Sequence, residues 1–404
     1  MSPQVRILLW ILIVFSLLGA LFAGISTYDF VAHLDRQVHA ITCAFVPGLA
    51  ARDASGTSGC HAAMMSPYSS VLRTSTWGGI PISLPGLAVF AFLLAFALHL
   101  LLSGQPLERA DTWFLLAATL LPVVVSAVYF AIAVTKVGAV CKLCIGIYVA
   151  SLGVLVAAVL LHWRAVRPRG QGATWGRFLA YAVQGVAFVL VPVLLYLALK
   201  PAYPQAALAG CGSLLHPEDK YDVRIAVASR AGGIPAIEVM DPLCAACKGF
   251  TQRLSASGFE QQLELEVVLF PLDKECNWMV SESLHPGACA VSETILAAGP
   301  QAPAVLAWVF DHQEELRRLG DLGAAAVQAR VKQEFPEIAS NLGKPATKSR
   351  LNRSLRWVVS NSLPVLTPQL YVGGEKVCDE DTDLGLEYVL SRLLERRGTA
   401  GGGR

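Results

Sequence analysis

Five long stretches without a charged residue occupy most of the first half of the chain. Each can supply the ~20 apolar residues that a helix needs to cross the hydrocarbon core of a bilayer. The second stretch is longer than needed, so its helix is expected to begin near Ile82, after the turn-like Gly78–Pro81. We therefore predict five transmembrane helices, one in each of the stretches 7–28, 74–107, 112–135, 143–163 and 178–199.

Charged residues become frequent after Lys200, and the pattern changes to that of a soluble α/β domain. Short apolar runs there indicate strands, and a glycine such as Gly258 is suited to end a helix. The predicted order is a strand at 234–241, a helix to about Ser257, a strand at 263–272, a mainly helical section to about Ser362, a strand, turn and strand at 365–374, and a closing helix from about Asp383.

The first apolar stretch has a second interpretation as a cleaved signal peptide. The small residues Ala20, Ala23 and Gly24 form a loose cleavage pattern within it. The apolar core of a signal peptide is usually only ~7–15 residues long, and this stretch is longer. We favour a retained transmembrane helix; cleavage would leave four spans and the same location for the soluble domain.

Four arginines gather in the short connection between the fourth and fifth stretches, which the positive-inside rule places in the cytoplasm. Counting back from this connection puts loop 28–80, the turn at 141–144 and everything after Lys200 on the outer side. All ten cysteines then lie on or near an oxidising face, where disulfides persist. The arginines are Arg164, Arg167, Arg169 and Arg177.

The composition limits the classes of partner. Of 404 residues, 54% are hydrophobic and 15% charged, and the net charge is +2. No basic stripe is interleaved with aromatic residues, so nucleic acid is not an expected partner. A lipid bilayer is.

A dithiol motif, Cys141-x-x-Cys144, stands at the mouth of the fourth predicted span. One thiol at a helix start lies near the positive end of the helix dipole, which favours its thiolate. Cys144 is the inner member, closer to the lipid. A zinc site is the competing interpretation, but zinc normally takes four ligands and nearby external segments offer no matching histidines and cysteines. We favour redox chemistry and expect no metal.

Cys43 and Cys60 lie in loop 28–80, separated by a segment rich in glycine and serine. Two thiols on such a loop are able to close on each other and then exchange with the pair at the helix mouth. A static disulfide that ties down the loop is the alternative, and spacing alone slightly favours it.

Several motifs follow one another along the membrane half: Ser58-Gly59-Cys60, Ser66-Pro67-Tyr68-Ser69, Gly79-Ile80-Pro81, Gly86 and Cys141-Lys142-Leu143-Cys144. Together they resemble the vitamin K epoxide reductase family over residues 5–165. The resemblance implies a four-helix bundle around a quinone of the ubiquinone or menaquinone type, with Cys141 and Cys144 as the active-site pair. It also implies that Cys144 reacts with the quinone and that Cys43 and Cys60 carry electrons to Cys144.

A second dithiol, Cys244-x-x-Cys247, follows the predicted strand at 234–241, and this half resembles the thioredoxin fold with the inserted helices of disulfide-bond oxidases. The resemblance implies that Thr367-Pro368 is a cis-proline dipeptide beside the dithiol, rather than an ordinary trans one. It implies that Glu238 is a buried acid serving Cys247, rather than an exposed strand residue. Cys244 is the expected exposed, attacking thiol.

The Ala245-Ala246 dipeptide of that motif offers no histidine to stabilise the thiolate of Cys244. We therefore expect a couple less oxidising than the strongest oxidases, which lie near ~−120 mV.

Four cysteines remain. Cys276 and Cys289 indicate a local structural clamp at the start of the helical section, whereas Cys211 and Cys378 pair only by elimination. Leu208-Ala-Gly-Cys211 also mimics a lipidation motif, but it follows a fifth span and we treat it as coincidence.

The predicted fold is a membrane four-helix bundle with a fifth linking helix, followed by an α/β thioredoxin-like domain with a helical insertion. The expected parts are a membrane domain at 1–165, a fifth helix and linker at 166–215, a thioredoxin-like domain at 216–396 and a flexible tail at 397–404.

The predicted function is a quinone-dependent thiol:disulfide oxidoreductase of the bacterial cytoplasmic (inner) membrane, with its soluble domain on the periplasmic side. Its expected partners are membrane quinone and exported proteins with reduced thiols. Electrons would pass from these substrates through Cys244 and Cys247, then Cys43 and Cys60, then Cys141 and Cys144. The alternatives are a tethered isomerase or chaperone with the membrane part as anchor, and a protein that binds soft metals.

Overall fold

The computed structural model describes residues 1–37, 40–44, 58–165, 174–203, 210–228 and 232–401. The chain forms two compact units, Met1–Ala202 and Tyr203–Arg404, which we call the membrane unit and the soluble unit. The boundary falls inside the predicted linker, and the finer division of the chain stays a prediction. Arg167, Arg169 and the first two residues of the lipidation-like motif, Leu208 and Ala209, lie outside the described residues.

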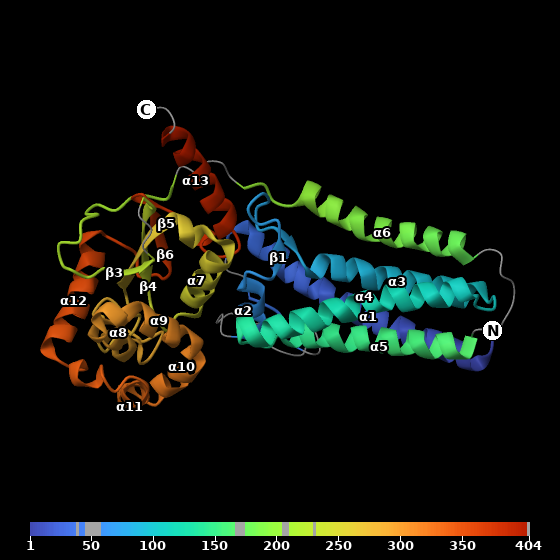
Figure 1. Ribbon diagram of the computed structural model, residues 1–404, viewed down its shortest axis with the longest axis horizontal. Coiled ribbons are helices and arrows are strands. Elements are labelled where there is room, and N and C mark those ends of the chain that lie inside the picture. Colours follow the sequence, from blue (N-terminus) through green and yellow to red (C-terminus); the bar gives the residue numbers. More distant parts are fainter. Residues whose placement is uncertain (38–39, 45–57, 166–173, 204–209, 229–231, 402–404) are drawn as a thin grey trace. The chain divides into compact units, whose positions relative to one another are not determined.

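The membrane unit is built on long helices that run alongside one another in Figure 1. Five of them are long and apolar enough to cross a membrane, as predicted. The predicted start of the second span, near Ile82, is also close, since α3 begins at Ser83. The helices are α1 (Pro3–Ala32), α3 (Ser83–Ser103), α4 (Arg109–Ile132), α5 (Lys142–Ala165) and α6 (Thr174–Leu199).

Small residues let α1 lie close to its neighbours. A side chain at Gly19 would collide with the ring of Phe90 on α3, and one at Gly153 on α5 would collide with Phe15. Close backbone approach of this kind is how helices gain packing energy in lipid, where the hydrophobic effect between helices is weak. The first apolar stretch is therefore an integral helix of this bundle.

The fifth helix, α6, packs on the outside of the other four. Tyr181 lies 4.8 Å from the ring of Phe96 on α3, and Tyr196 donates a 2.7 Å hydrogen bond to the carbonyl of Gly79. Its other side chains, such as Leu179 and Leu194, are exposed and would face lipid. The four-helix bundle with an additional fifth helix is confirmed.

Short elements cover one end of this bundle. They are the helix α2 (Gly59–Met65) and an antiparallel strand pair, β1 (Ser70–Val71) with β2 (Ile80–Pro81). At Gly59 the chain passes so close to the carbonyl of Val140 that only glycine fits. This contact brings α2 against the segment that leads into α5.

The soluble unit contains a five-stranded sheet in the order β3-β5-β4-β6-β7. β4 and β5 are parallel, and the other pairs are antiparallel. The helix α7 (Ala245–Ser257) connects β4 to β5, and α13 (Leu386–Gly401) packs against α7. This arrangement is the predicted thioredoxin-like fold. The strands are β3 (Ile225–Ala228), β4 (Ile234–Met240), β5 (Leu263–Leu269), β6 (Gln369–Val372) and β7 (Glu375–Lys376).

Helices inserted between β5 and β6 form a subdomain that is visible beside the sheet in Figure 1. Alternation along β5 explains how the sheet is covered on both faces, because successive side chains point to opposite sides. Val267 and Leu269 pack in the core shared with α8 and α9, whereas Val268 packs with Leu355 and Trp357 of α12. The inserted helices are α8 (Ala288–Ala297), α9 (Ala302–Asp311), α10 (Gln313–Asp321), α11 (Ala324–Glu334) and α12 (Pro345–Ser360).

Some predicted boundaries shift in the structure. β5 ends at Leu269 rather than at 272, because the backbone N–H of Leu272 turns to the carboxylate of Asp241. α13 begins at Leu386 rather than at Asp383, and it runs to Gly401, into the segment assigned to a tail.

Candidate active sites

The first dithiol stands at the start of α5. Cys141 precedes the helix and its carbonyl accepts the N–H of Ile145 at 3.0 Å, so it acts as the N-cap. Its sulfur accepts the backbone N–H of Cys144 at 3.4 Å, one of the donors left unpaired at a helix start. Both cysteines are free thiols; Cys141 is buried and Cys144 is half-buried.

The loop cysteines lie in the same apolar cluster as this dithiol. Cys43 and Cys60 form a disulfide with a sulfur–sulfur distance of 2.09 Å, and Cys60 sits on α2. Cys60 and Cys141 are buried together with Phe22 of α1, while Cys43 and Cys144 pack at the edge of the cluster. Three separate chain segments thus bring the four cysteines of the membrane unit together.

A cavity of ≈ 470 Å³ opens beside these sulfurs. Cys60, Cys141 and Cys144 line it, together with apolar side chains from α1, α3, α4 and α5. Its few polar groups include Asp29, which accepts the N–H of Thr42 at 2.8 Å, and Tyr148, one turn beyond Cys144. A mostly apolar pocket of this size with a few polar groups suits a small ring compound that carries oxygen atoms. The lining therefore fits a quinone head group.

The second dithiol stands at the start of α7, directly after β4. Cys244 is the N-cap and Cys247 lies in the first turn. Cys244 is 7% exposed and Cys247 is fully buried, so the expectation of an exposed attacking thiol is wrong. The carbonyl of Thr367 covers the Cys244 sulfur at 3.8 Å, and the Thr367–Pro368 peptide bond is cis.

The environments of the two thiols differ. A hydrogen bond from Cys247 is the largest influence on the pKa of Cys244, which falls to about 6 although burial opposes the fall. Burial raises the pKa of Cys247 well above its usual value. The thiolate therefore resides on Cys244 and the proton on Cys247, which suits Cys244 as the nucleophile and leaving group.

Glu238 lies on β4 below this pair. Its side chain is 1% exposed, so the alternative of an exposed strand glutamate is wrong. Among the described residues, none donates a hydrogen bond to its Oε1. Burial, followed by the charges of Cys244 and Glu260, raises the pKa of Glu238 to about 8. A carboxyl group with this pKa is able to exchange protons near neutral pH.

Three further residues hold the turn before α7, and sequence reasoning missed all of them. Asp241 is fully buried and its Oδ2 lies 2.8 Å from Nδ1 of His285. Gln313 of α10 donates from Nε2 to the carbonyls of Pro242 and Cys244, both at 3.0 Å. His285 and Gln313 come from the insertion, far along the chain, so no local pattern could connect them to the dithiol.

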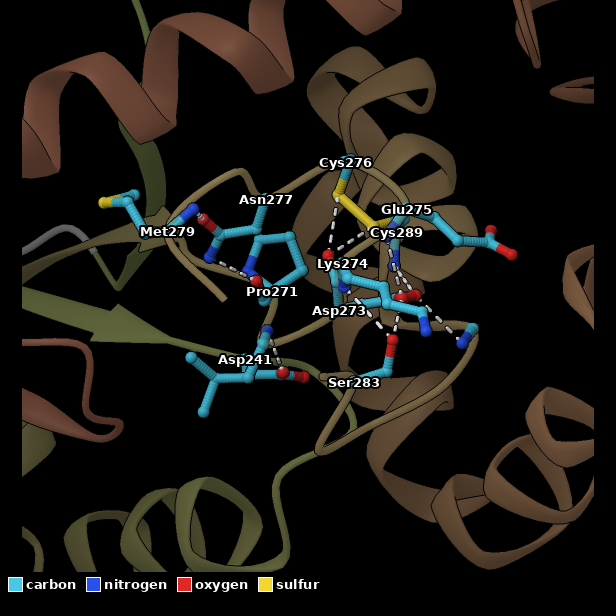
Figure 2. Close-up of a disulfide and its surroundings, with 12 residues drawn as sticks. Asp241, Pro271, Asp273, Lys274, Glu275, Cys276, Asn277, Met279, Ser283 and Cys289 are labelled. Carbon is cyan, nitrogen blue, oxygen red and sulfur yellow. Dashed lines mark hydrogen bonds between the residues drawn. A yellow bond between two sulfur atoms is a disulfide. The ribbon is translucent and has the colours of Figure 1, made fainter. Parts of the chain in front are cut away.

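The structure pairs Cys276 with Cys289 as expected, and it joins Cys211 to Cys378, a pair that the sequence could assign only by elimination. Cys276 joins Cys289 with a sulfur–sulfur distance of 2.07 Å, as Figure 2 shows. Cys211 joins Cys378, and its N–H also bonds to the carbonyl of Lys376 on β7. Within the described residues, no group of three or more histidines, cysteines and carboxylates is placed to hold a metal.

Residues 10–159 match the family model described as Vitamin K epoxide reductase family. This range runs from within α1 to within α5 and contains Cys43, Cys60, Cys141 and Cys144. Among curated proteins, none matches the chain.

The solved structures similar to the chain include two oxidoreductases and a variant of ScsC. DsbA from Xylella fastidiosa is 19% identical with a TM-score of 0.30, and the match covers 45% of this chain and 100% of that one. NmDsbA1 from N. meningitidis is 13% identical with a TM-score of 0.32, covering 49% and 100%. A linker-deletion mutant of Proteus mirabilis ScsC is 15% identical with a TM-score of 0.29, covering 57% and 100%. At these scores the likenesses carry no argument, and the fold assignment rests on the strand order.

Proposed function

Because residues 10–159 belong to the vitamin K epoxide reductase family, we propose that the protein is a quinone-linked oxidoreductase that forms disulfides in exported proteins. Membership of this family, together with the thioredoxin-like fold, makes it a thiol–disulfide oxidoreductase. The observation that supports the quinone linkage is the cavity that Cys60, Cys141 and Cys144 line together.

Electrons enter the soluble unit by thiol exchange. A substrate thiolate attacks the sulfur of Cys244 in the Cys244–Cys247 disulfide, and the Cys247 sulfur leaves and takes up a proton. A second substrate thiolate then displaces Cys244. The substrate has lost two electrons and two protons, and the dithiol has gained them. Glu238, with its raised pKa, is placed to carry the proton of Cys247.

The reduced soluble dithiol then passes its electrons to the membrane unit. The Cys244 thiolate attacks the Cys43–Cys60 disulfide, and Cys247 resolves the mixed disulfide by reforming its bond to Cys244. Cys43 and Cys60, now reduced, reduce a disulfide between Cys141 and Cys144 in the same way. Because both units are parts of one chain, their effective concentration is of the order of millimolar.

The membrane dithiol delivers the electrons at the cavity. Cys141 and Cys144 both line the cavity, and we assign the step with the ligand to Cys144 because it lies within α5, further from the helix start than Cys141. A bound quinone would accept two electrons and two protons. Tyr148 and Asp29 are among the polar lining groups that would orient its oxygens, and the apolar walls would exclude water.

We place the soluble unit on the periplasmic side. Arg164 donates to Gln4 at 2.9 Å and Arg177 pairs with Glu108, so the charged ends of four helices meet at one end of the bundle. The positive-inside rule puts such an end in the cytoplasm. A reporter that is active only in the periplasm should work when joined after Lys200 and stay silent when joined within 165–175. The opposite pattern would reverse the topology.

Quinone reduction by the full-length protein tests the proposal. The purified protein is given a reduced peptide with two thiols and either a ubiquinone or a menaquinone analogue, and quinol formation is followed by absorbance. We expect turnover in the wild type and its loss in Cys244→Ala. If peptide disulfides rearranged at the same rate with and without quinone, that result would favour the isomerase alternative instead.

A further inference from the structure

The turn before α7 contains a buried negative charge close to the reactive thiol. Asp241 is fully buried, three positions before Cys244, whose N–H bonds to the Asp241 carbonyl at 3.1 Å. Its carboxylate accepts the backbone N–H groups of Leu243 at 2.7 Å and Leu272 at 2.6 Å. A buried carboxylate disfavours a second negative charge nearby, so on its own Asp241 would oppose formation of the Cys244 thiolate.

A cationic side chain meets this carboxylate. Nδ1 of His285 lies 2.8 Å from Oδ2 of Asp241, and the imidazole is 15% exposed. The pair is therefore largely shielded from water. Charge interactions are stronger in such a shielded site than in water. His285 in its charged form compensates Asp241.

The loop that carries His285 is folded tightly around a second carboxylate. Asp273 accepts the N–H of Gly287 at 3.0 Å, the N–H of Cys289 at 3.2 Å and the hydroxyl of Ser283 at 2.8 Å. The Cys276–Cys289 disulfide closes the loop, and Figure 2 shows it directly beside Asp273. The backbone N–H of His285 is fixed as well, bonded to the carbonyl of Leu272 at 3.2 Å.

The same loop is pressed against α10. Gly287 has a φ of +87°, and a Cβ there would lie 2.9 Å from the Cα of Gly320. α10 also contributes Gln313, which holds the Cys244 carbonyl. Loop and helix therefore converge on one turn, and the position of His285 is determined by packing as well as by its hydrogen bond.

We infer that His285, set in place by Asp241 and by the loop that Cys276–Cys289 closes, is a positioning residue that stabilises the Cys244 thiolate. The inference rests on the proposed thiol exchange at Cys244. In the step concerned, a second substrate thiolate forms a bond to the substrate sulfur, and the bond from that sulfur to Cys244 breaks. The electron pair stays on Cys244, where the charge of His285 offsets that of Asp241.

The charges around both groups are consistent with this role. Burial lowers the pKa of His285, but the hydrogen bond and charge of Asp241 outweigh it, and the net pKa is raised. His285 in turn lowers the pKa of Cys244, after the larger effect of Cys247, while Asp241 raises it. The other titratable groups nearby are Glu238 on β4, whose pKa is affected by Cys244, and Arg317 on α10, which faces His285. His285, which comes from the helical insertion, thus stabilises the Cys244 thiolate, which the Ala245-Ala246 dipeptide cannot do.

Peptide-resolved alkylation of the full-length reduced protein tests the inference. Short pulses of iodoacetamide across a series of pH values, followed by mass spectrometry of the Cys244 peptide, give the pH midpoint of its reactivity. His285→Asn keeps a donor for Asp241 and removes the charge, so the midpoint should rise by about one pKa unit or more. His285→Lys keeps a charge and should restore a low midpoint. His216→Asn, an exposed imidazole of the same unit, should change nothing.

A double variant separates charge from structure. Adding Asp241→Asn to His285→Asn removes the uncompensated carboxylate, so the midpoint should move back towards the wild type. The inference would be overturned if the midpoint of His285→Asn equalled that of the wild type. It would also be overturned if the midpoint of the double variant were equal to or higher than that of His285→Asn. His285→Gln, with the same expected rise, replaces His285→Asn should that variant not fold. The readout needs neither quinone nor substrate, so its failure is distinguishable from failure of the proposed function.

Discussion

Cys141 and Cys244 occupy the same place in their helices, each as the N-cap with its partner thiol three residues further on. Their surroundings differ. Around Cys141 the walls are apolar and enclose a cavity, whereas around Cys244 a network of Asp241, His285 and Gln313 fixes the backbone and the local charge. The same local motif therefore serves two tasks. In both, the helix start favours a thiolate, and the neighbouring elements determine which molecule that thiolate can react with.

The largest expected effect tests the membrane side of this comparison. Cys144→Ala should abolish quinone reduction by the full-length protein and leave the fold intact. Among the described residues of that unit, Cys144 is the only free thiol within α5, so no other thiol there can replace it. Quinol absorbance with a reduced peptide substrate is the measurement, with circular dichroism as the check on folding. Ser103→Ala, at the far end of α3, should keep full turnover. Full turnover in Cys144→Ala would mean that quinone is reduced elsewhere.

The second test asks whether the two dithiols exchange electrons. In Cys247→Ser combined with Cys60→Ser, Cys244 first forms a mixed disulfide with an added small-molecule disulfide and releases one of its thiols. The Cys43 thiolate then attacks the Cys244 sulfur and displaces the other small thiol. Because neither resolving thiol remains, the Cys244–Cys43 link should accumulate. We expect Cys244 linked to Cys43 in peptides digested without reduction and identified by mass spectrometry. Adding Cys244→Ser should remove the link. If Cys244 were found joined only to foreign proteins, with either loop cysteine removed, the two units would not be partners in electron transfer.

The third test separates structural from reactive sulfur. Replacing both Cys276 and Cys289 by alanine should lower the free energy of unfolding of the soluble unit by ~2–5 kcal/mol, because the loop loses its covalent closure. Pulse proteolysis of the full-length protein at increasing urea concentration measures this loss. The matched change at Cys43 and Cys60 should leave the unfolding midpoint of the soluble unit where it is. Equal midpoints for wild type and the Cys276 and Cys289 variant would assign the bridge no structural role.

The smallest expected effect concerns Glu238, the buried acid on β4. Burial raises the pKa of Glu238 from 4.5 to about 8, so the folded protein favours the neutral carboxyl group. Its contribution to stability is complete below pH 4.5 and is lost as the pH rises to about 8. Glu238→Gln should match the wild type near pH 4.5 and exceed it at pH 9 by about 1–4 kcal/mol. Thermal unfolding across pH measures this, and the exposed Glu264→Gln should show no such trend.

Structural features that depend on a short, continuous stretch of sequence could be predicted. The five spans follow from composition and length alone, and α7 ends at Gly258 as its glycine indicated. The edge strand β3 was missed, since four residues of Ile225–Ala228 carry too little pattern to be recognised. His285 was missed for a different reason, because only the folded insertion brings it to Asp241. The burial of Cys244 likewise depends on Thr367, which lies more than a hundred positions away.

The Cys211–Cys378 disulfide makes most of the soluble unit a closed ring. The two cysteines are 167 positions apart, and Ser213 also pairs with Glu375 at the sheet edge. A protease that nicks the chain once within this ring cannot release a fragment, since both pieces stay joined through the sulfur bridge. The piece that begins at the nick therefore stays attached to the membrane unit as well. Damage of this kind would be invisible on a gel until a reductant is added.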